Sequence, residues 1–402
     1  MQELKEYILD RSEELKDELI RIRRYIHMNP ELSFEEQNTA LFICEYLDKI
    51  GIRYRNKVAG TGIIGEISGG LKSNRVIGLR AEMDALPVTE KTFSSYLSRI
   101  PGKMHACGHD AHIAMLLGVA RLLSSMQARF GGTILLIFQP GEELAPGGAK
   151  SMIESGAFND PKPGIVLAQH VLPDLTTGKV GYKSGRYMAS SDEIYITIIG
   201  KGGHAALPGS TTDQLYIASS LIKRLKDAIS AKQVNNIPTV LGFGRIIADG
   251  ATNVIPDKVE IAGTFRTFDE KWRSEAKNLI RDISSDTAKE FHVTVDLKIV
   301  DGYPVLFNNE KLTDAAVKLS SELLGKNNVE LFDIRMSSDD FSYFSREFPS
   351  LYFRTGIKKS GEEMKKLHSS EFDIDEEGMV TGVANLSWLV INFLSDDWGY
   401  LF

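Results

Sequence analysis

Short runs of Ile, Val and Leu, separated by turn residues, dominate the first half of the chain. Four such runs occupy residues 63–67, 75–79, 133–138 and 164–169. Runs of this length and composition are typical of strands that are buried on both faces of a sheet. Between the second and third runs, residues 112–126 carry apolar side chains at helical spacing. Strands that alternate with helices predict an α/β fold, with helices packed on the faces of the sheet.

Two helices are predicted before the first strand. Residues 1–30 form a charged, amphipathic segment that ends at Asn29 and Pro30, and a second helix runs from about residue 35 to Gly51. Cys44 lies on this second helix among leucines, so we expect it in the core.

The pattern changes after Tyr187 and predicts a second domain. Strands at 193–200, 239–246, 258–268 and 292–300 alternate with helices at 213–230 and 270–291. The order βαββαβ is that of a ferredoxin-like sandwich. The α/β pattern then returns, with a strand at 349–356 and a helix at 375–394. We therefore predict a catalytic domain of residues 1–189 and 302–402, interrupted by an inserted lid of residues 190–301.

Composition limits the classes of function. The chain has 402 residues and a formal net charge of -7, which argues against a nucleic-acid partner because phosphate binding needs a basic surface. No apolar run reaches the ~20 residues of a membrane helix. The charged opening segment lacks the apolar core of a signal peptide, so a cytoplasmic protein is expected. The two cysteines, Cys44 and Cys107, lie in different contexts and do not suggest a disulfide.

The stretch MHACGHDAH, residues 104–112, holds three of the eight histidines and one of the two cysteines. Other candidate metal ligands follow the predicted strands. The whole set consists of Asp84, Cys107, His109, Glu142, Glu143, His170 and His368. Because the carboxyl ends of parallel strands share one edge of a sheet, we expect these side chains to converge there. Sulfur, nitrogen and oxygen ligands together suit Zn²⁺ or a similar divalent ion.

The number of candidate ligands indicates two metal ions. A single catalytic zinc typically keeps three protein ligands and an open position. Five ligands from this set, one of them shared, fit two metals roughly 3.5–4 Å apart, which would polarise a carbonyl and generate hydroxide at neutral pH. One carboxylate must stay free as general base. The doublet Glu142–Glu143 can supply both roles, one residue to metal and the other to water.

A dinucleotide-binding pattern is also present but lacks its structural context. GTGIIG, residues 60–65, matches G-x-G-x-x-G. That motif requires a strand before it and a helix opening from it. Here the glycines run into a predicted strand, so the sequence does not favour a nicotinamide-linked oxidoreductase.

Several motifs, in order along nearly the whole chain, resemble one family. They are HMNPELSFEE (27–36), RAEMDALPV (80–88), GKMHACGHDAH (102–112), FQPGEE (138–143), GKGGHAALP (200–208), NVIPD (253–257), GTFRTF (263–268) and LHSSEFDIDEE (367–377). Together they resemble the two-metal aminoacylase/carboxypeptidase family, and within it the branch of N-acyl-amino-acid amidohydrolases that contains hippurate hydrolases and auxin-conjugate hydrolases. The resemblance implies a zinc-peptidase-like α/β domain with an inserted α+β lid that mediates dimerisation.

The resemblance also implies roles for individual residues. The expected metal ligands are Cys107, His109, Glu143, His170 and His368, with Cys107 shared as a thiolate. Two ions per chain are implied, with Zn²⁺ favoured by the ligands and Mn²⁺, Co²⁺ or Ni²⁺ as alternatives.

Further roles are implied around these ligands. Glu142 would be the general base toward water and then the proton donor to the leaving amine. His204, in the lid, would stabilise the oxyanion, in its own chain or across a dimer. Asn253 and Arg266 would hold the carbonyl or carboxylate of the substrate.

Some positions are ambiguous or depart from the family pattern. Asp84 would either orient a ligand or cap a loop, and Asp110 would cap the following helix, hold a ligand imidazole, or both. Glu82 and Asp339 stand where the family commonly has Asp and Glu, respectively. His27 is far from the motifs of the strand ends, and we interpret it as structural.

The sequence therefore predicts a metal-dependent amidohydrolase that cleaves N-acyl amino acids, acting on a small-molecule amide as a homodimer and without nucleic-acid or membrane partners. A dipeptidase and an N-acetyl-diaminopimelate-type deacetylase are the close alternatives. A non-catalytic member that only binds ligand or metal is the alternative from another class.

Overall fold

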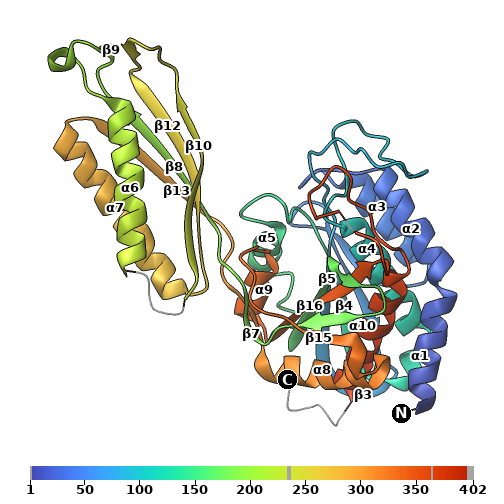
Figure 1. Cartoon of the computed structure of the whole chain (residues 1–402). Helices are drawn as coiled ribbons and strands as arrows, with labels where there is room; N and C mark the ends of the chain where they lie inside the picture. Colours follow the sequence, from blue (N-terminus) through green and yellow to red (C-terminus); the bar gives the residue numbers. More distant parts are fainter. Residues whose placement is uncertain (1, 233–236, 364, 396–402) are drawn as a thin grey trace. The chain divides into compact units, whose positions relative to one another are not determined.

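The computed structural model describes residues 2–232, 237–363 and 365–395, and the chain forms two compact units (Figure 1). The first unit comprises Met1–Tyr187, Phe307–Asp333 and Asp339–Phe402, and the second comprises Met188–Leu306 and Ile334–Ser338. The role of the second unit as a lid and dimerisation domain stays a prediction.

An eight-stranded sheet forms the centre of the first unit. Its strands are, in spatial order, β1 (Arg53–Val58), β2 (Gly62–Ser68), β4 (Gly131–Gln139), β3 (Leu71–Glu82), β5 (Ile165–Thr176), β16 (Ser350–Lys358), β6 (Val180–Tyr182) and β15 (Val329–Leu331). The neighbours β4, β3, β5 and β16 run parallel to one another. Their carboxyl ends therefore lie at one edge, which we call the carboxyl edge of the sheet. The stretch GTGIIG, residues 60–65, forms a turn and the start of β2. The next element is the strand β3, and not the helix that a dinucleotide-binding motif requires.

Helices cover this sheet. They are α1 (Gln2–Glu14), α2 (Lys16–Met28), α3 (Gln37–Lys49), α4 (His109–Ser124), α5 (Gly148–Glu154), α8 (Glu310–Leu324), α9 (Phe341–Glu347) and α10 (Gly378–Leu394). The apolar helix α4 packs against both α2 and α10, and nearly all its residues are buried. Cys44 on α3 is buried in the core, as predicted. Because α4 is apolar on nearly all sides, it needs the cover that α2 and α10 provide.

The single helix predicted over residues 1–30 is wrong in one respect, because it is divided into α1 and α2 at Leu15. Leu15 keeps helical dihedral angles (φ -79°, ψ -11°), and its amide donates to the Arg11 carbonyl over a long 3.3 Å. The division is thus a local weakening of the helical hydrogen bonds rather than a turn.

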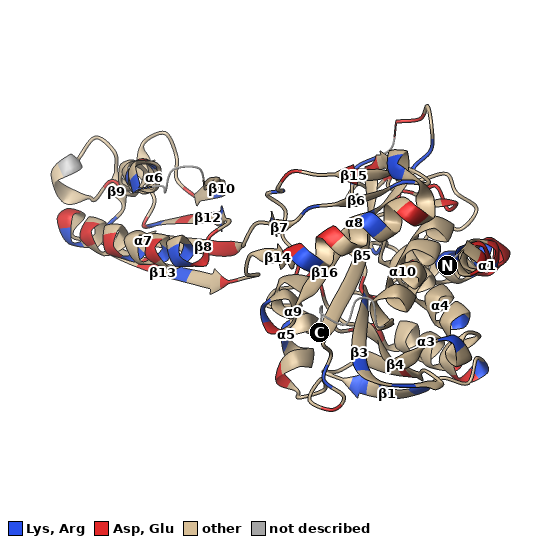
Figure 2. Cartoon of the chain, turned by 90° about the horizontal axis from the view of Figure 1, so that it is seen from below, with Lys and Arg blue, Asp and Glu red and all other residues tan. Residues whose placement is uncertain are grey.

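The second unit confirms the predicted ferredoxin-like order. Its four-stranded antiparallel sheet has the order β10 (Thr239–Ala248), β12 (Lys258–Thr267), β8 (Asp192–Ile199) and β13 (Thr294–Asp301). Two helices, α6 (Gln214–Lys232) and α7 (Glu270–Phe291), pack on it around buried residues such as Ile196 and Leu221. Acidic and basic residues are both spread along α7 (Figure 2).

Shorter elements complete the structure. A two-stranded ribbon pairs β9 (Gly203–His204) with β11 (Val254–Ile255), and another pairs β7 (Gly185–Met188) with β14 (Leu306–Asn308). The short 3₁₀ turns are Gln127–Arg129, Pro208–Ser210 and Lys326–Asn328. In the described part of the chain, no helix combines the length and the apolar character needed to cross a lipid bilayer.

Candidate metal centre

The five side chains expected to bind metal come together at the carboxyl edge of the sheet. Cys107, His109 and His170 each offer a ligand atom within 4.8 Å of the other two. Cys107 forms a second group of this kind with Glu143 and His368. The sulfur of Cys107 therefore belongs to both groups, which is the arrangement that a shared ligand between two ions requires.

A left-handed glycine between Cys107 and His109 turns the chain into α4. Gly108 has φ +87°, and a Cβ at this position would lie 2.5 Å from a methyl group of Val171. Glycine is thus needed here both for its conformation and for the lack of a side chain. The helix begins at His109 and not at residue 112 as predicted, because this glycine already ends the preceding loop.

The two buried histidines direct the same ring nitrogen toward the other ligands. His170 Nδ1 lies 2.7 Å from the carbonyl of Val171, and its Nε2 lies 3.4 Å from Cys107 Sγ. His109 Nδ1 lies 2.8 Å from the carbonyl of Asp84, and its Nε2 is buried without a hydrogen-bond partner among the described residues. Hydrogen bonds at Nδ1 leave Nε2 as the free lone pair that a metal takes.

The position of His170 differs slightly from the prediction. It lies within β5 and not after its end, since β5 continues to Thr176 through its pairing with β16, where Arg354 is opposite His170. His170 nevertheless lies at the carboxyl edge of the sheet. Burial holds the pKa of His170 well below its usual range, which keeps the imidazole neutral, as metal ligation requires.

His368 comes from a loop and has a strained backbone. Its φ is +64°, and its amide donates to the carbonyl of Ala106 at 2.8 Å. Nε2 lies 3.3 Å from Oε1 of Glu143, and the side chain is 54 % exposed. This member of the cluster therefore lies at its solvent-accessible side. A non-glycine residue with positive φ persists only where the surroundings hold it, which is frequent at functional sites.

The loop after β4 carries Glu142 and Glu143. The Glu143 amide donates to Asp84 Oδ2 at 2.9 Å, which fixes the backbone of the doublet. Glu142 is buried, and its Oε2 lies 3.9 Å from His109 Nε2. Burial, together with the negative charges of Asp339 and Glu143, raises the pKa of Glu142 well above its usual range.

The charge of the cluster fits divalent cations. Burial and the nearby carboxylates of Glu143 and Glu142 raise the pKa of the Cys107 thiol well above its usual range. His109 Nε2 is buried without a hydrogen-bond partner among the described residues, and the buried Glu143 Oε1 meets His368 Nε2 at 3.3 Å without a hydrogen bond. A thiol, imidazoles and carboxylates that crowd together with unused lone pairs are a donor set for Zn²⁺ or a related ion. The residues present therefore fit a pair of metal ions.

Asp84 and Asp110, ambiguous in the sequence, have distinct contacts. Asp84 Oδ1 lies 3.3 Å from His109 Nδ1, while Oδ2 accepts hydrogen bonds from Ser33 and from the Glu143 amide. Asp84 thus both orients an imidazole and supports a loop.

The contacts of Asp110 differ from both roles predicted for it. It makes no capping hydrogen bond at the start of α4, because Gly108 occupies the capping position. Its Oδ2 instead lies 3.0 Å from Arg23 Nε and 2.7 Å from His27 Nδ1. His27 therefore contacts the residue that directly follows the candidate ligand His109, although the two histidines are distant in the sequence.

Sequence reasoning missed a buried ionic cluster behind the site. Arg80 is fully buried and pairs with Glu82, with Asp340 at 2.6 Å and with Asp339 at 3.2 Å. Glu82 accepts from His112 at 2.8 Å, and Tyr352 donates to Asp339 at 2.6 Å. The available signal was an arginine at the end of an apolar strand, since a charge buried there requires a partner.

The remaining three predicted site residues lie in the second unit. His204 on β9 and Asn253 in the turn before β11 are both exposed, and the Ala205 amide donates to the Asn253 carbonyl at 2.9 Å. Arg266 lies on β12 and donates to the Met336 carbonyl at 2.8 Å. Burial lowers the pKa of Arg266 from its usual value.

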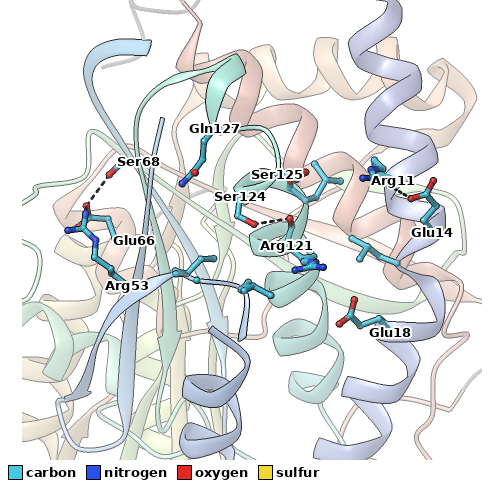
Figure 3. Close-up of a pocket in the computed structure, with 15 residues that line it drawn as sticks. Arg11, Glu14, Glu18, Arg53, Glu66, Ser68, Arg121, Ser124, Ser125 and Gln127 are labelled. Carbon is cyan, nitrogen blue, oxygen red and sulfur yellow. Dashed lines mark hydrogen bonds and ion pairs between the residues drawn. The ribbon is translucent and has the colours of Figure 1, made fainter. Parts of the chain in front are cut away.

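Figure 3 shows a polar cavity that none of the candidate metal ligands lines. It has a volume of about 540 Å³ and is lined by residues that include Arg53, Glu66, Ser68 and Arg121. Ser68 pairs with Thr133, at the start of β4, so this cavity faces the amino ends of the parallel strands. None of the residues predicted for catalysis lines it.

Comparisons with known proteins agree with this geometry. The sequence model of peptidase family M20/M25/M40 matches residues 78–392. The chain is 37% identical to thermostable carboxypeptidase 2 of Saccharolobus solfataricus, over 94% of this chain and 96% of that protein. It is 36% identical to the N-acyl-L-amino acid amidohydrolase of Geobacillus stearothermophilus, over 76% and 82% of the two chains. A crystal structure from Bacillus subtilis, described as a dinuclear metal binding peptidase of the M20 family, has a TM-score of 0.81 at 30% identity and covers 95% of this chain and 99% of that one.

Proposed function

Since the chain belongs to peptidase family M20/M25/M40 and is thus a metal-dependent hydrolase of amide bonds, we propose that it cleaves N-acyl amino acids. The acyl groups in question are N-acetyl, N-benzoyl or similar ones. The observation that supports the mechanism best is the sulfur of Cys107, which two groups of candidate ligands share. The name of the Geobacillus relative supports the substrate class.

The proposed metal ligands are Cys107, His109, Glu143, His170 and His368. When bound, two divalent ions would supply Lewis acidity toward the carbonyl and lower the pKa of water. The thiolate and imidazoles favour Zn²⁺, while Mn²⁺, Co²⁺ and Ni²⁺ are alternatives.

Glu142 is the proposed general base. Its carboxylate is buried beside His109 and is the member of the acidic doublet that the Cys107 groups do not use. It would take the proton of the attacking water and then give it to the leaving nitrogen. A carboxyl group whose pKa burial raises is suited to carry a proton between these two steps.

The second unit would complete the site. His204 offers an exposed imidazole for the developing oxyanion, in its own chain or in a partner's. Asn253 and Arg266 would hold the carbonyl and carboxylate of the substrate, for which a guanidinium has the right fork geometry.

A homodimer through the second unit is part of the proposal. Strand β10 is at an edge of its sheet, and Val240, Ile246 and Ile247 on it are 43%, 55% and 43% exposed. An exposed apolar edge strand favours pairing with a second copy. A cytoplasmic location, and the absence of nucleic-acid and membrane partners, stay predictions.

A dipeptidase is the second candidate, favoured by the carboxypeptidase name of the Saccharolobus relative. A diaminopimelate-type deacetylase shares the same chemistry. A binding protein without turnover is less well supported, because every expected ligand and the base are present.

A hydrolysis screen of the metal-reconstituted protein tests the proposal. It would contain N-acetyl, N-benzoyl and indole-acyl amino acids together with dipeptides, and Glu142→Gln would serve as the blank. We expect turnover of N-acyl amino acids that disappears in the variant and in chelator. Cleavage of dipeptides alone would favour the second candidate, and two bound ions without any cleavage would favour a binding protein.

A further inference from the structure

We propose that Arg23 is a positioning residue that ties together the two segments carrying His109 and His368. This inference rests on the proposed two-metal function. The two histidines belong to different groups of candidate ligands, so the distance between their segments determines whether both groups can form.

Arg23 lies on α2 and is fully buried, with three carboxylates around its guanidinium. Nε lies 3.0 Å from Asp110 Oδ2, and Nη2 lies 2.6 Å from Asp373 Oδ1. Nη1 lies 3.0 Å from Glu376 Oε1. One side chain thus pairs with carboxylates from two distant parts of the sequence.

These carboxylates are close to the metal residues in the chain. Asp110 directly follows His109 at the start of α4. Asp373 and Glu376 belong to the segment 367–377, which begins beside His368. Arg23 therefore joins the start of α4 to this segment from behind.

Contacts nearer to the site join the same two segments. The His368 amide donates to the carbonyl of Ala106, and the ring of Phe372 lies 3.7 Å from the position that a Cβ on Gly108 would occupy. Since His368 itself is more than half exposed, packing around its own side chain is weak. The buried arginine supplies the anchor that the exposed loop lacks.

Two further neighbours contact the carboxylates of Asp373 and Asp110. Tyr96 donates to Asp373 Oδ2 at 2.8 Å and accepts from Arg23 Nη1 at 3.2 Å. His27 lies 2.7 Å from the same Asp110 oxygen that Arg23 contacts. A planar guanidinium can contact several acceptors in fixed directions, whereas an ammonium group cannot reproduce that geometry.

A purely stabilising role would not require this chemistry. Buried ion pairs are often no more stable than well-packed apolar residues of the same volume. They do restrict geometry, and ligand sites depend on supporting groups to hold their ligands within about 0.5 Å. The location of the network, directly behind two ligand segments, is what assigns it to positioning.

The test measures metal binding and not activity. Apo-protein would be titrated with Co²⁺ and with Zn²⁺, and binding would be followed by calorimetry and by the absorption spectrum of Co²⁺. The proteins compared are the wild type, Arg23→Lys, Arg23→Met and Tyr96→Phe. His368→Ala would show the signature of damage to one group of ligands. Arg273→Met is the matched control, because Arg273 is a buried arginine that pairs with Asp192 at 2.7 Å within the second unit.

We expect Arg23→Lys to resemble His368→Ala. The affinity for the more weakly bound ion should fall by roughly 10–100-fold, as is usual when a supporting partner of a ligand is lost. The affinity for the more tightly bound ion should change by less than about 3-fold. Tyr96→Phe should give a smaller loss at the same ion. Arg273→Met should lose thermal stability and bind both ions as the wild type does.

Two results would overturn the inference. One is wild-type affinity for both ions in Arg23→Lys and Tyr96→Phe. The other is an equal loss of affinity for both ions that parallels the loss of thermal stability, since this is the result expected of a residue with only a structural role. If Arg23→Met does not fold, Tyr96→Phe, which keeps the arginine, decides. If the wild type binds two ions and hydrolyses no amide, the proposed function fails, while the selective loss in Arg23→Lys would still support positioning.

Discussion

Asp84 contacts His109 through two of its atoms at once. Its backbone carbonyl lies 2.8 Å from His109 Nδ1, and its carboxylate Oδ1 lies 3.3 Å from the same nitrogen. The other carboxylate oxygen accepts the Glu143 amide, so one residue aligns candidate ligands from α4 and from the loop after β4. Burial lowers the pKa of His109, but the hydrogen bond to Asp84 raises it to about 10 in the absence of metal, so a metal ion would displace a proton from Nε2.

The variant Asp84→Asn should weaken metal binding without abolishing it. The carbonyl contact to His109 remains, but the charge that orients the imidazole and supports the Glu143 amide is removed. We expect a loss of affinity of roughly 10-fold or more, measured by competition with a chromophoric chelator. Ser33→Ala is the control, because it removes only the hydroxyl that donates to Asp84 at 2.6 Å. Equal affinities of Asp84→Asn and the wild type would contradict the orienting role.

The variant Glu142→Gln should lose turnover while keeping both ions. Its amide has the size of the carboxylate but cannot accept a proton, and general-base catalysis typically contributes about 10²–10⁴-fold. The measurement is kcat on the best substrate of the screen, with metal content measured on the same sample. Glu154→Gln, on the exposed side of α5, should retain full activity. A Glu142→Gln variant with more than a tenth of the wild-type kcat would exclude Glu142 as the base.

Removal of metal should lower thermal stability. In the apo state the buried carboxylates of the cluster lose their counter-charge, and a ligand that binds only the folded state stabilises it by about 2.7 kcal/mol at 100 times its Kd. We expect a lower Tm in chelator, restored by added Zn²⁺. The double variant Glu143→Ala/His368→Ala should show a smaller difference between the two conditions. A Tm that chelator leaves unchanged would mean that the cluster does not hold metal in the folded protein.

His27 should make stability depend on alkaline pH. Although burial opposes it, the hydrogen bonds to Asp110 and Glu90 raise the pKa of His27 from 6.5 to about 9. The folded state therefore binds about one more proton than the unfolded state between these values, and stability should fall as pH rises through this window. Below pH 6.5 the contribution is complete. Urea unfolding of wild type and His27→Gln across pH 6–9.5 checks this, and the difference between the two should shrink toward high pH. A constant difference would show that His27 stays neutral.

The strands that the sequence predicted well are those with one dominant cause. β4 and β5 are buried on both faces along most of their length, and β3 is buried over its carboxyl-terminal half, where burial selects Ile, Val and Leu. β1 was not predicted, because its pattern of RYRNKV is polar and its place at the sheet edge leaves it mostly exposed. The three-residue strands β6 and β15 were also missed. β6 is held by pairing with β16, and β15 by pairing with β6, and such pairing cannot be detected in the local composition.

The candidate site divides in the same way. The ligand positions after the strands were accessible to prediction, because such side chains are rare in apolar surroundings and the sheet brings them together. Arg23 was not, since it stands in a helix with many charges, IRIRRYIH, and only the fold shows that this arginine is buried and Arg24 is 41% exposed. Asp340 likewise depends on Arg80, more than 250 positions away in the sequence.

The interrupted course of the first unit has a consequence for how the protein is made. β16 fits between β5 and β6 in the sheet, although residues 188–306 are synthesised between them, and His368 follows later still. At 5–20 residues per second, the ribosome needs about 10 to 40 seconds to extend the chain from the end of β6 at Tyr182 to that histidine. Until then the nascent chain carries an open sheet and only part of its candidate ligands. Capture of the full pair of ions would thus be one of the last events of biosynthesis, and a prematurely terminated chain would be left without it.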